Sequence, residues 1–204
     1  MNPNSPDEYL TIQSPVRDKI KVESSIFIAT AVPVNSEDTV KDKLRSISRE
    51  FHDATHNCFA WIIKDPQPER FKYSDAGEPR GTAGKPILSA IESEQLFNIL
   101  VVVTRYFGGI KLGTGGLSRA YRLSAQNALQ KAKKATRWIT AEIGISYPLN
   151  MTGKVNQILG RYEVKVLESS FENYAKVRIQ VRNGWLVNIK KALVDVTNGQ
   201  VKFE

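Results

Sequence analysis

The segment from Arg105 to Arg119 combines glycines and cations in a pattern that suits anion binding. Its sequence, RYFGGIKLGTGGLSR, places five glycines between positions 108 and 116. Glycines tolerate positive φ angles, so neighbouring backbone N–H groups can converge on one ligand, and a helix that starts here adds partial positive charge. The alternative is a tight turn whose glycines serve close packing. The anion-binding interpretation predicts phosphate or nucleic-acid contacts from Arg105, Tyr106, Lys111, Gly113, Thr114, Gly115, Gly116, Arg119 and Arg122.

The charge around this segment has one sign. Residues 95–141 contain no Asp or Glu and carry eight basic side chains. The whole chain has 29 basic and 21 acidic residues, so these eight account for its entire formal charge of +8. A basic field beside accessible backbone amides favours a polyanion such as RNA as the partner. Tyr106, at the border of the glycines, could also stack on an unpaired base.

Two familiar nucleotide motifs do not fit the chain. A Walker A loop around Gly84 and Lys85 would need glycine at position 79 and Ser or Thr at 86, but proline occupies both positions. A dinucleotide fingerprint that starts at Gly113 meets Ser118 where its third glycine belongs. Both failures favour polyanion binding over nucleotide chemistry.

A second polar segment, residues 74–86, carries two carboxylates. Asp75 and Glu78 are candidates for a catalytic pair or for Mg²⁺ binding, with Thr82 and Lys85 close in sequence. The favoured interpretation is a loop held by its own hydrogen bonds, because Asp and Gly also suit turns. The carboxylates could also pair with the Arg and Lys side chains of the glycine segment.

His56 and Cys58 lie two positions apart, so they share one face of a strand. Only His52 could join them as a further zinc ligand, which leaves the set short of an ordinary zinc site. We therefore favour a packed thiol and a hydrogen-bonded imidazole over a metal centre or a cysteine nucleophile. No metal and no cofactor is predicted.

The hydrophobic pattern predicts the elements that position these residues. Ser36 is expected to cap a helix that continues to Phe51, and a second amphipathic helix is expected from Leu117 to Ala132. The outer face of this second helix is expected to present Arg119, Arg122, Gln126, Gln130, Lys133 and Lys134. The other expected elements are strands over 21–34, 58–63 and 98–107, an irregular loop over 64–86 and a short helix over 86–97.

A different pattern begins near residue 141, where acidic side chains return. The order strand, helix, strand, strand, helix, strand is that of a ferredoxin-like βαββαβ domain. The expected strands span 141–149, 162–171, 174–183 and 199–203, and the expected helices span 152–161 and 184–195. We therefore predict an α+β protein with an N-terminal domain at residues 1–138 and a ferredoxin-like domain at residues 139–204.

Composition indicates the compartment. The first residues lack the basic and apolar blocks of a secretory signal, and the longest aliphatic run, residues 99–103, is too short to cross a bilayer. Cys58 is the only cysteine, so no intrachain disulfide can form. These features predict a cytoplasmic protein without a membrane partner, and they predict no particular oligomeric state.

Two motifs carry a resemblance to a known family. The first is Ser74-Asp75…Gly77-Glu78-Pro79…Gly81-Thr82-Ala83-Gly84, and the second is the continuous run from Val102 to Leu117. Together with Ala54-Thr-His-Asn-Cys58, they strongly resemble the YigZ/Impact family over residues 15–138. The C-terminal part resembles the small extra domain of the bacterial members. The family commonly has Asp-Asp-Gly-Glu-Pro where this chain has Asp75-Ala76, which weakens a metal role that needs paired aspartates.

The resemblance implies a fold and a direction for function. It implies an N-terminal α/β sandwich like the second domain of ribosomal protein S5, followed by a ferredoxin-like domain like that of ribosomal translocases. Eukaryotic relatives are tied to translational control through protein partners. The first hypothesis is therefore a non-catalytic RNA- or ribosome-associated protein that modulates translation. The alternatives are a metal-assisted enzyme acting on a phosphorylated small molecule or nucleotide, and an adaptor whose basic helix meets an acidic protein partner.

Overall fold

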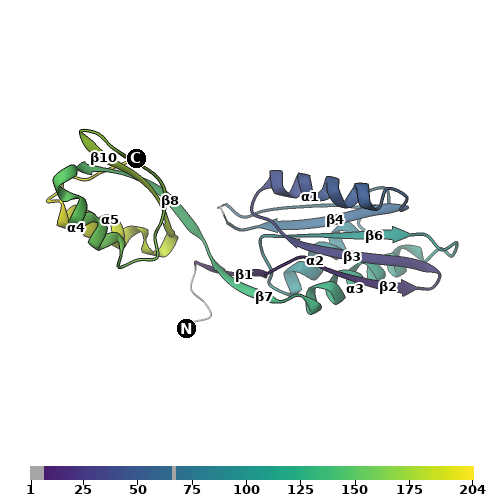
Figure 1. Cartoon of the computed structure of the whole chain (residues 1–204). Helices are drawn as coiled ribbons and strands as arrows, with labels where there is room; N and C mark the ends of the chain where they lie inside the picture. The colour runs from purple at the N-terminus through teal and green to yellow at the C-terminus, as the bar shows by residue number, and fades with distance from the viewer. Residues whose placement is uncertain (1–6, 66–67) are drawn as a thin grey trace. The chain divides into compact units, whose positions relative to one another are not determined.

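The computed structural model describes residues 7–65 and 68–204, which divide into two compact units (Figure 1). One unit comprises Tyr9–Arg137. The other comprises residues 138–204 together with Asp7 and Glu8. The sequence had assigned all residues up to 138 to the N-terminal domain. Hydrogen bonds explain the difference, because Ile139 N donates to Asp7 O across 2.7 Å and Trp138 Nε1 donates to Glu8 Oε1 across 3.1 Å.

The N-terminal unit is built on a five-stranded antiparallel sheet with the order β2-β3-β6-β4-β5. Its strands are β2 (Val16–Val22), β3 (Ser25–Pro33), β4 (His56–Ile63), β5 (Arg70–Ser74) and β6 (Ile99–Tyr106). Helix α1 (Glu37–Glu50) covers one face, and α2 (Gly84–Ser93) and α3 (Gly113–Lys131) cover the other (Figure 1). This is the α/β sandwich expected from the resemblance.

Strand β6, which corresponds to the strand predicted over 98–107, is the centre of this sheet and is buried on both faces. Leu100 and Val102 pack in the cluster beneath α1, whereas Val101 and Val103 pack in the cluster beneath α2 and α3. The near-continuous aliphatic sequence explains this position, because a strand covered on both sides has no solvent face to fill with polar residues.

Local signals also explain the first and last helices of this unit. The Ser36 side chain accepts a hydrogen bond from Thr39 N across 3.1 Å, so it caps α1 as predicted. The predicted stripe on α3 is buried, and it includes Leu117, Tyr121 and Leu129. The helix starts at Gly113, four positions earlier than expected, and ends at Lys131. Lys133 and Lys134, which were expected on its outer face, therefore lie beyond it.

The two edge strands were not predicted as such. β2 was partly missed because its burial alternates only between half-buried and exposed, which is a weak hydrophobic signal. The segment predicted as an irregular loop over 64–86 contains β5, a short strand of mostly exposed residues paired with β4. Polar, short edge strands are hard to distinguish from loops by composition.

A separate two-stranded sheet is formed by β1 (Glu8–Ile12) and β7 (Lys134–Trp138). The C-terminal unit then follows the predicted element order. Its sheet has the order β11-β8-β10-β9, formed by β8 (Thr140–Pro148), β9 (Lys165–Phe171), β10 (Tyr174–Arg182) and β11 (Lys202–Phe203). Helices α4 (Thr152–Leu159) and α5 (Leu186–Val196) pack against one face of this sheet (Figure 1). Two short 3₁₀ turns, Leu149–Met151 and Asn183–Trp185, lead into these helices.

This strand order is that of the ferredoxin-like arrangement, so the predicted α+β class is confirmed. Two residues, Glu172 and Asn173, join β9 to β10, in agreement with the end of one predicted strand at 171 and the start of the next at 174. Among the described residues, no helix combines the length and apolar character that crossing a membrane requires.

Candidate nucleic-acid interface

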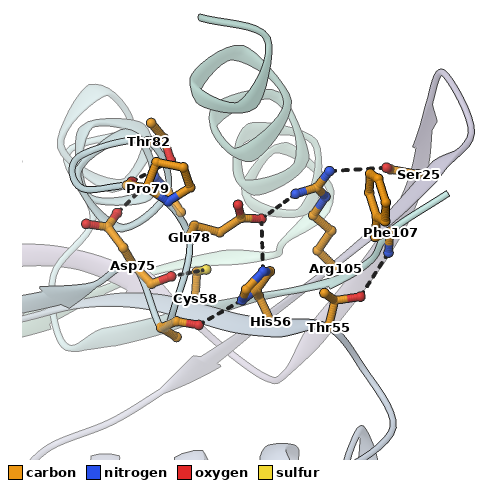
Figure 2. A network of polar contacts seen from close by, with 12 residues as sticks. Ser25, Thr55, His56, Cys58, Asp75, Glu78, Pro79, Thr82, Arg105 and Phe107 are labelled. Atoms are coloured by element: carbon orange, nitrogen blue, oxygen red, sulfur yellow. Dashed lines mark hydrogen bonds and ion pairs between the residues drawn. The ribbon is translucent and has the colours of Figure 1, made fainter. Parts of the chain in front are cut away.

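An ion pair inside the N-terminal unit joins the two motifs that the sequence analysis singled out. Arg105, near the end of β6, donates from Nη1 to Glu78 Oε1 across 2.6 Å, and their side chains are only 6% and 3% exposed (Figure 2). The Tyr121 hydroxyl of α3 donates to the same oxygen across 2.8 Å. The Arg105 guanidinium also lies beside the rings of Phe27 and Phe107. We had expected Arg105 to contact phosphate. The structure corrects this expectation, because the Arg105 side chain is buried in an ion pair.

The burial of Arg105 has a simple physical cause. Position 105 faces the α2–α3 side of the central strand, and a guanidinium there needs a counter-ion because an isolated buried charge is very costly. Glu78 supplies it from the loop that precedes α2. Of the two loop carboxylates, Glu78 therefore pairs with a cation of the glycine segment, Arg105, which was one of the expected alternatives.

His56 lies beside this pair in a defined orientation. Its Nδ1 is 2.9 Å from the carbonyl oxygen of Ala76 (Figure 2). Because a carbonyl oxygen can only accept, Nδ1 carries the proton, and Nε2 faces Glu78 Oε1 at 3.9 Å. Gly77 makes room for the imidazole, since a Cβ there would lie 3.1 Å from Nδ1. The expected hydrogen-bonded histidine is observed.

Asp75 holds the loop and the start of α2 together. Its Oδ2 accepts from Gly81 N at 2.8 Å, and its Oδ1 accepts from Ala83 N and Gly84 N at 3.0 and 2.9 Å. Burial raises the pKa of Asp75, but these backbone donors outweigh it and bring the pKa below its ordinary value. Figure 2 shows the carboxylates of Asp75 and Glu78 pointing in different directions. Asp75 therefore has the structural role that we favoured from the sequence, because it accepts the hydrogen bonds that hold its own loop.

Cys58 completes the buried network. Its Sγ is 2.9 Å from Asp75 O and 3.4 Å from the Tyr121 hydroxyl. Burial raises the pKa of the Cys58 thiol to about 12 and also raises that of Tyr121. The expected packed thiol is therefore observed, and both groups keep their protons near neutral pH.

In the glycine segment from Arg105 to Arg119, one glycine is required for close packing and others are exposed to solvent. A Cβ at Gly108 would overlap the Ser24 carbonyl, so this glycine serves close packing against the β2–β3 turn. Gly109 and Gly113 have φ angles of 88° and 66°, which favour glycine, and a Cβ at either position would meet no side chain or distant backbone of the described residues within 4 Å. The alternative of a tight turn with glycines for close packing therefore applies to Gly108. The remaining glycines of the segment are exposed or half-buried.

The first turn of α3 is positively charged and has no side-chain cap. Leu112 occupies the N-cap position without a side-chain hydrogen bond, and the first turn has no acidic residue. Thr114 and Gly115 are exposed there. The Arg119 guanidinium lies alongside this turn, because a Cβ at Gly115 would be 3.4 Å from its Nη1. Free N–H groups at a helix start attract anions.

The cations of residues 95–141, the stretch without Asp or Glu, differ in whether they form ion pairs. Lys131 pairs with Asp18 at 2.5 Å, and Lys134 pairs with Glu94 at 2.6 Å. Over residues 7–65 and 68–204, no ion pair involves the other exposed cations of residues 95–141, which are Lys111, Arg119, Arg122, Lys133 and Arg137, or the exposed Lys85 of α2. Tyr106 is engaged differently, because its hydroxyl donates to Asp53 Oδ1 across 2.8 Å.

A groove between β5, α2 and α3 was not predicted from the sequence. It has a volume of about 560 Å³. Phe71 and Tyr73 of β5 line the groove on one side, and Arg119 and Arg122 of α3 line it on the other. Residues of α2, which include Lys85, lie between them. The alternation Phe71-Lys-Tyr73 was a signal for this strand, but the surrounding Pro and Gly residues concealed it. Lys111 lines a separate hollow beyond Arg119, beside Ile110 and Leu123.

Comparisons with known proteins bear on this region. Residues 23–129, which contain the buried network and the glycine segment, match the sequence profile of the Impact N-terminal domain. The chain is 31% identical over 202 residues to IMPACT family member YvyE of Bacillus subtilis, covering 96% of this chain and 93% of that protein. It is 28% identical over 198 residues to IMPACT family member YigZ of Escherichia coli, covering 97% of each. A crystal structure of a hypothetical protein superposes with a TM-score of 0.77 at 28% identity, covering 97% of this chain and 96% of that one.

Proposed function

This chain belongs to the Impact family, as its two motifs predicted, and from this premise we propose that it binds RNA, free or in the ribosome, and thereby modulates translation without catalysing a reaction. The observation that carries the proposal is the set of exposed, unpaired cations beside the uncapped start of α3. Lys111, Arg119 and Arg122 belong to this set. We call them, together with Lys85 of the adjacent groove, the cationic surface.

The physical chemistry of this surface suits a phosphate backbone. An unpaired Arg or Lys can neutralise a phosphate without first breaking an internal ion pair, and each neutralised phosphate releases condensed counter-ions. The free N–H groups near Gly113–Gly116 can donate to phosphate oxygens in the field of the helix start. Phosphate contacts of this kind give affinity and orientation with little dependence on sequence.

The engagement of the acidic side chains supports binding rather than catalysis. Asp75 accepts three backbone hydrogen bonds, and Glu78 is held in a buried ion pair. A carboxylate committed in this way must give up stabilising contacts before it can bind a metal or move a proton. The cationic surface, in contrast, has its donors free.

A salt titration tests the proposal directly. We expect a labelled single-stranded RNA to bind at low salt, with log affinity falling against log salt at a slope of roughly −3 if about four phosphates are neutralised. Fluorescence anisotropy measures this slope. Arg119→Glu combined with Arg122→Glu should lower the affinity by at least a factor of about 100 and leave the melting temperature nearly unchanged, because both side chains are exposed.

A matched control uses two exposed lysines of the C-terminal unit. Lys154→Glu combined with Lys191→Glu makes the same change in net charge on α4 and α5, and it should leave RNA affinity within about twofold of wild type. No binding at low salt, or equal losses in the two double variants, would refute the assignment of RNA binding to the cationic surface. Sedimentation with ribosomes, followed by nuclease treatment, separates ribosomal RNA from an acidic protein as the bound partner.

A further inference from the structure

We infer that the groove between β5, α2 and α3 receives an unpaired nucleobase, so that the protein selects single-stranded over double-stranded RNA. This inference rests on the proposed function, since it assigns a part of the ligand to a part of the same surface. Its starting observation is the pair Phe71 and Tyr73, which are 59% and 42% exposed.

The two rings lie where a base can reach them. Phe71 and Tyr73 are two positions apart on β5, so both point to the same face of the sheet, and both line the groove. Within the described part of the chain, β5 is the last strand of the sheet and pairs only with β4, so no other described strand covers its outer edge. Aromatic side chains that remain in water on a sheet are a recurrent platform for stacking single-stranded bases.

The opposite side of the groove suits the phosphate of the same nucleotide. Arg119 and Arg122 are three positions apart on α3, so they lie on one face of the helix. Lys85, in the first turn of α2, adds a third cation to the lining. A base stacked on the rings therefore leaves its phosphate near three donors. The volume of about 560 Å³ falls in the range of small-ligand sites.

One carboxylate orients this arrangement. Glu92 of α2 also lines the groove, and its negative charge disfavours phosphate close to it. A carboxylate can instead accept a hydrogen bond from an exocyclic amino group of a base. The charges of the groove thus place the base edge towards Glu92 and the phosphate towards Lys85, Arg119 and Arg122.

The physical reason for strand selection is access. In a duplex the bases are stacked and paired inside the helix, so their faces cannot meet Phe71 or Tyr73 unless the duplex opens. The cationic surface can contact the phosphates of either form. Duplex RNA therefore receives the electrostatic contribution alone, and single-stranded RNA receives stacking in addition.

The test compares one single strand with its own duplex. Wild-type protein, measured by anisotropy at fixed salt, should bind a 12-nucleotide RNA about tenfold or more tightly than the duplex made from it, given the usual strength of base–aromatic stacking. Phe71→Leu combined with Tyr73→Leu keeps apolar side chains but removes both rings. It should abolish this preference by weakening single-strand binding while leaving duplex affinity within about twofold.

The chain offers a matched control. Phe171 and Tyr174 form an equally exposed Phe and Tyr pair, at 58% and 51%, at the β9–β10 turn of the C-terminal unit. Phe171→Leu combined with Tyr174→Leu should change neither affinity. A melting curve for each variant confirms that it is folded, and Tyr73→Phe, which retains the ring, should keep most of the preference.

The outcomes separate the inference from the proposed function. If wild-type protein binds neither RNA form, the proposed function fails and the inference fails with it. If it binds RNA but prefers the duplex, or if Phe71→Leu with Tyr73→Leu retains the single-strand preference, the base site is refuted while RNA binding stands. Loss of the preference in that variant alone supports the base site.

Discussion

Arg105 Nη1 and Glu78 Oε1 lie 2.6 Å apart in the interior of the N-terminal unit, although the residues are 27 positions apart in sequence. The ion pair ties the loop that precedes α2 to the end of the central strand β6. Tyr121 reinforces it from α3, and the ring of Phe27 shields it. Because both charges are out of water, each depends on the other for compensation.

Removal of one charge of this pair should destabilise the unit strongly. Glu78→Gln preserves the shape of the side chain but leaves the buried Arg105 guanidinium without a counter-ion. We expect the N-terminal unit to lose about 3–5 kcal/mol of unfolding free energy. Hydrogen exchange of the β6 amides measures this loss without interference from the C-terminal unit.

A double variant distinguishes loss of charge balance from loss of packing. Glu78→Met with Arg105→Met removes both charges and keeps apolar volume, so it should recover most of the stability lost in Glu78→Gln. Protection of the β6 amides in Glu78→Gln equal to that of wild type would contradict the ion-pair account.

The contribution of Asp75 should vanish in acid. The folded-state pKa of Asp75 lies below its ordinary value: burial raises it, but hydrogen bonds from Gly81, Gly84 and Ala83 outweigh that effect. A carboxyl whose pKa is lowered by folding stabilises the protein above its unfolded pKa, about 3.9, and stops doing so as pH falls through the folded value. Urea denaturation from pH 7 to pH 2 should therefore show a smaller acid-induced loss for Asp75→Asn than for wild type.

At neutral pH, Asp75→Asn should cost about 1–2 kcal/mol, because an amide has only one oxygen for the three backbone donors. Asp195→Asn, at an exposed position of α5, provides the control and should retain the wild-type acid profile. Identical profiles for all three proteins would rule out Asp75 as a stabilising cap.

Gly77 and Gly109 should respond differently to the same substitution. Both have positive φ angles, 91° and 88°, so alanine strains the backbone at either position. Only at Gly77 would the new Cβ also press on the His56 ring, at 3.1 Å from Nδ1. We expect Gly109→Ala to cost about 1 kcal/mol and Gly77→Ala about 2–3 kcal/mol, as measured by urea denaturation. Equal losses would mean that the imidazole yields without cost.

Cys58 should be unreactive in the native protein. Burial raises the pKa of its thiol to about 12, so almost none is thiolate at pH 8. A disulfide reagent such as DTNB should modify Cys58 only as fast as the unit opens, and at once in 6 M guanidinium. Rapid modification of the native protein at pH 8 would contradict the packing of this thiol against Tyr121 and the Asp75 carbonyl.

Elements whose signal is local were predictable from sequence alone. The apolar run of β6, the repeat along α3, the Ser36 cap and the Glu172-Asn173 turn each depend on residues within a few positions of one another. The β5 strand was not predictable in this way, because its pairing with β4 is decided across the sheet and its own residues are mostly exposed.

The α+β class, the order of most elements and the concentration of positive charge between residues 95 and 141 follow from the amino-acid sequence. Which of those charges are free depends on the folded structure. Partners distant in sequence bury Arg105 against Glu78 and pair Lys131 with Asp18, whereas Lys111, Arg119 and Arg122 keep exposed side chains. Net charge is a sum over the chain, but the availability of a cation depends on burial and on the nearest carboxylate, and both are set by the packing of segments far apart in sequence.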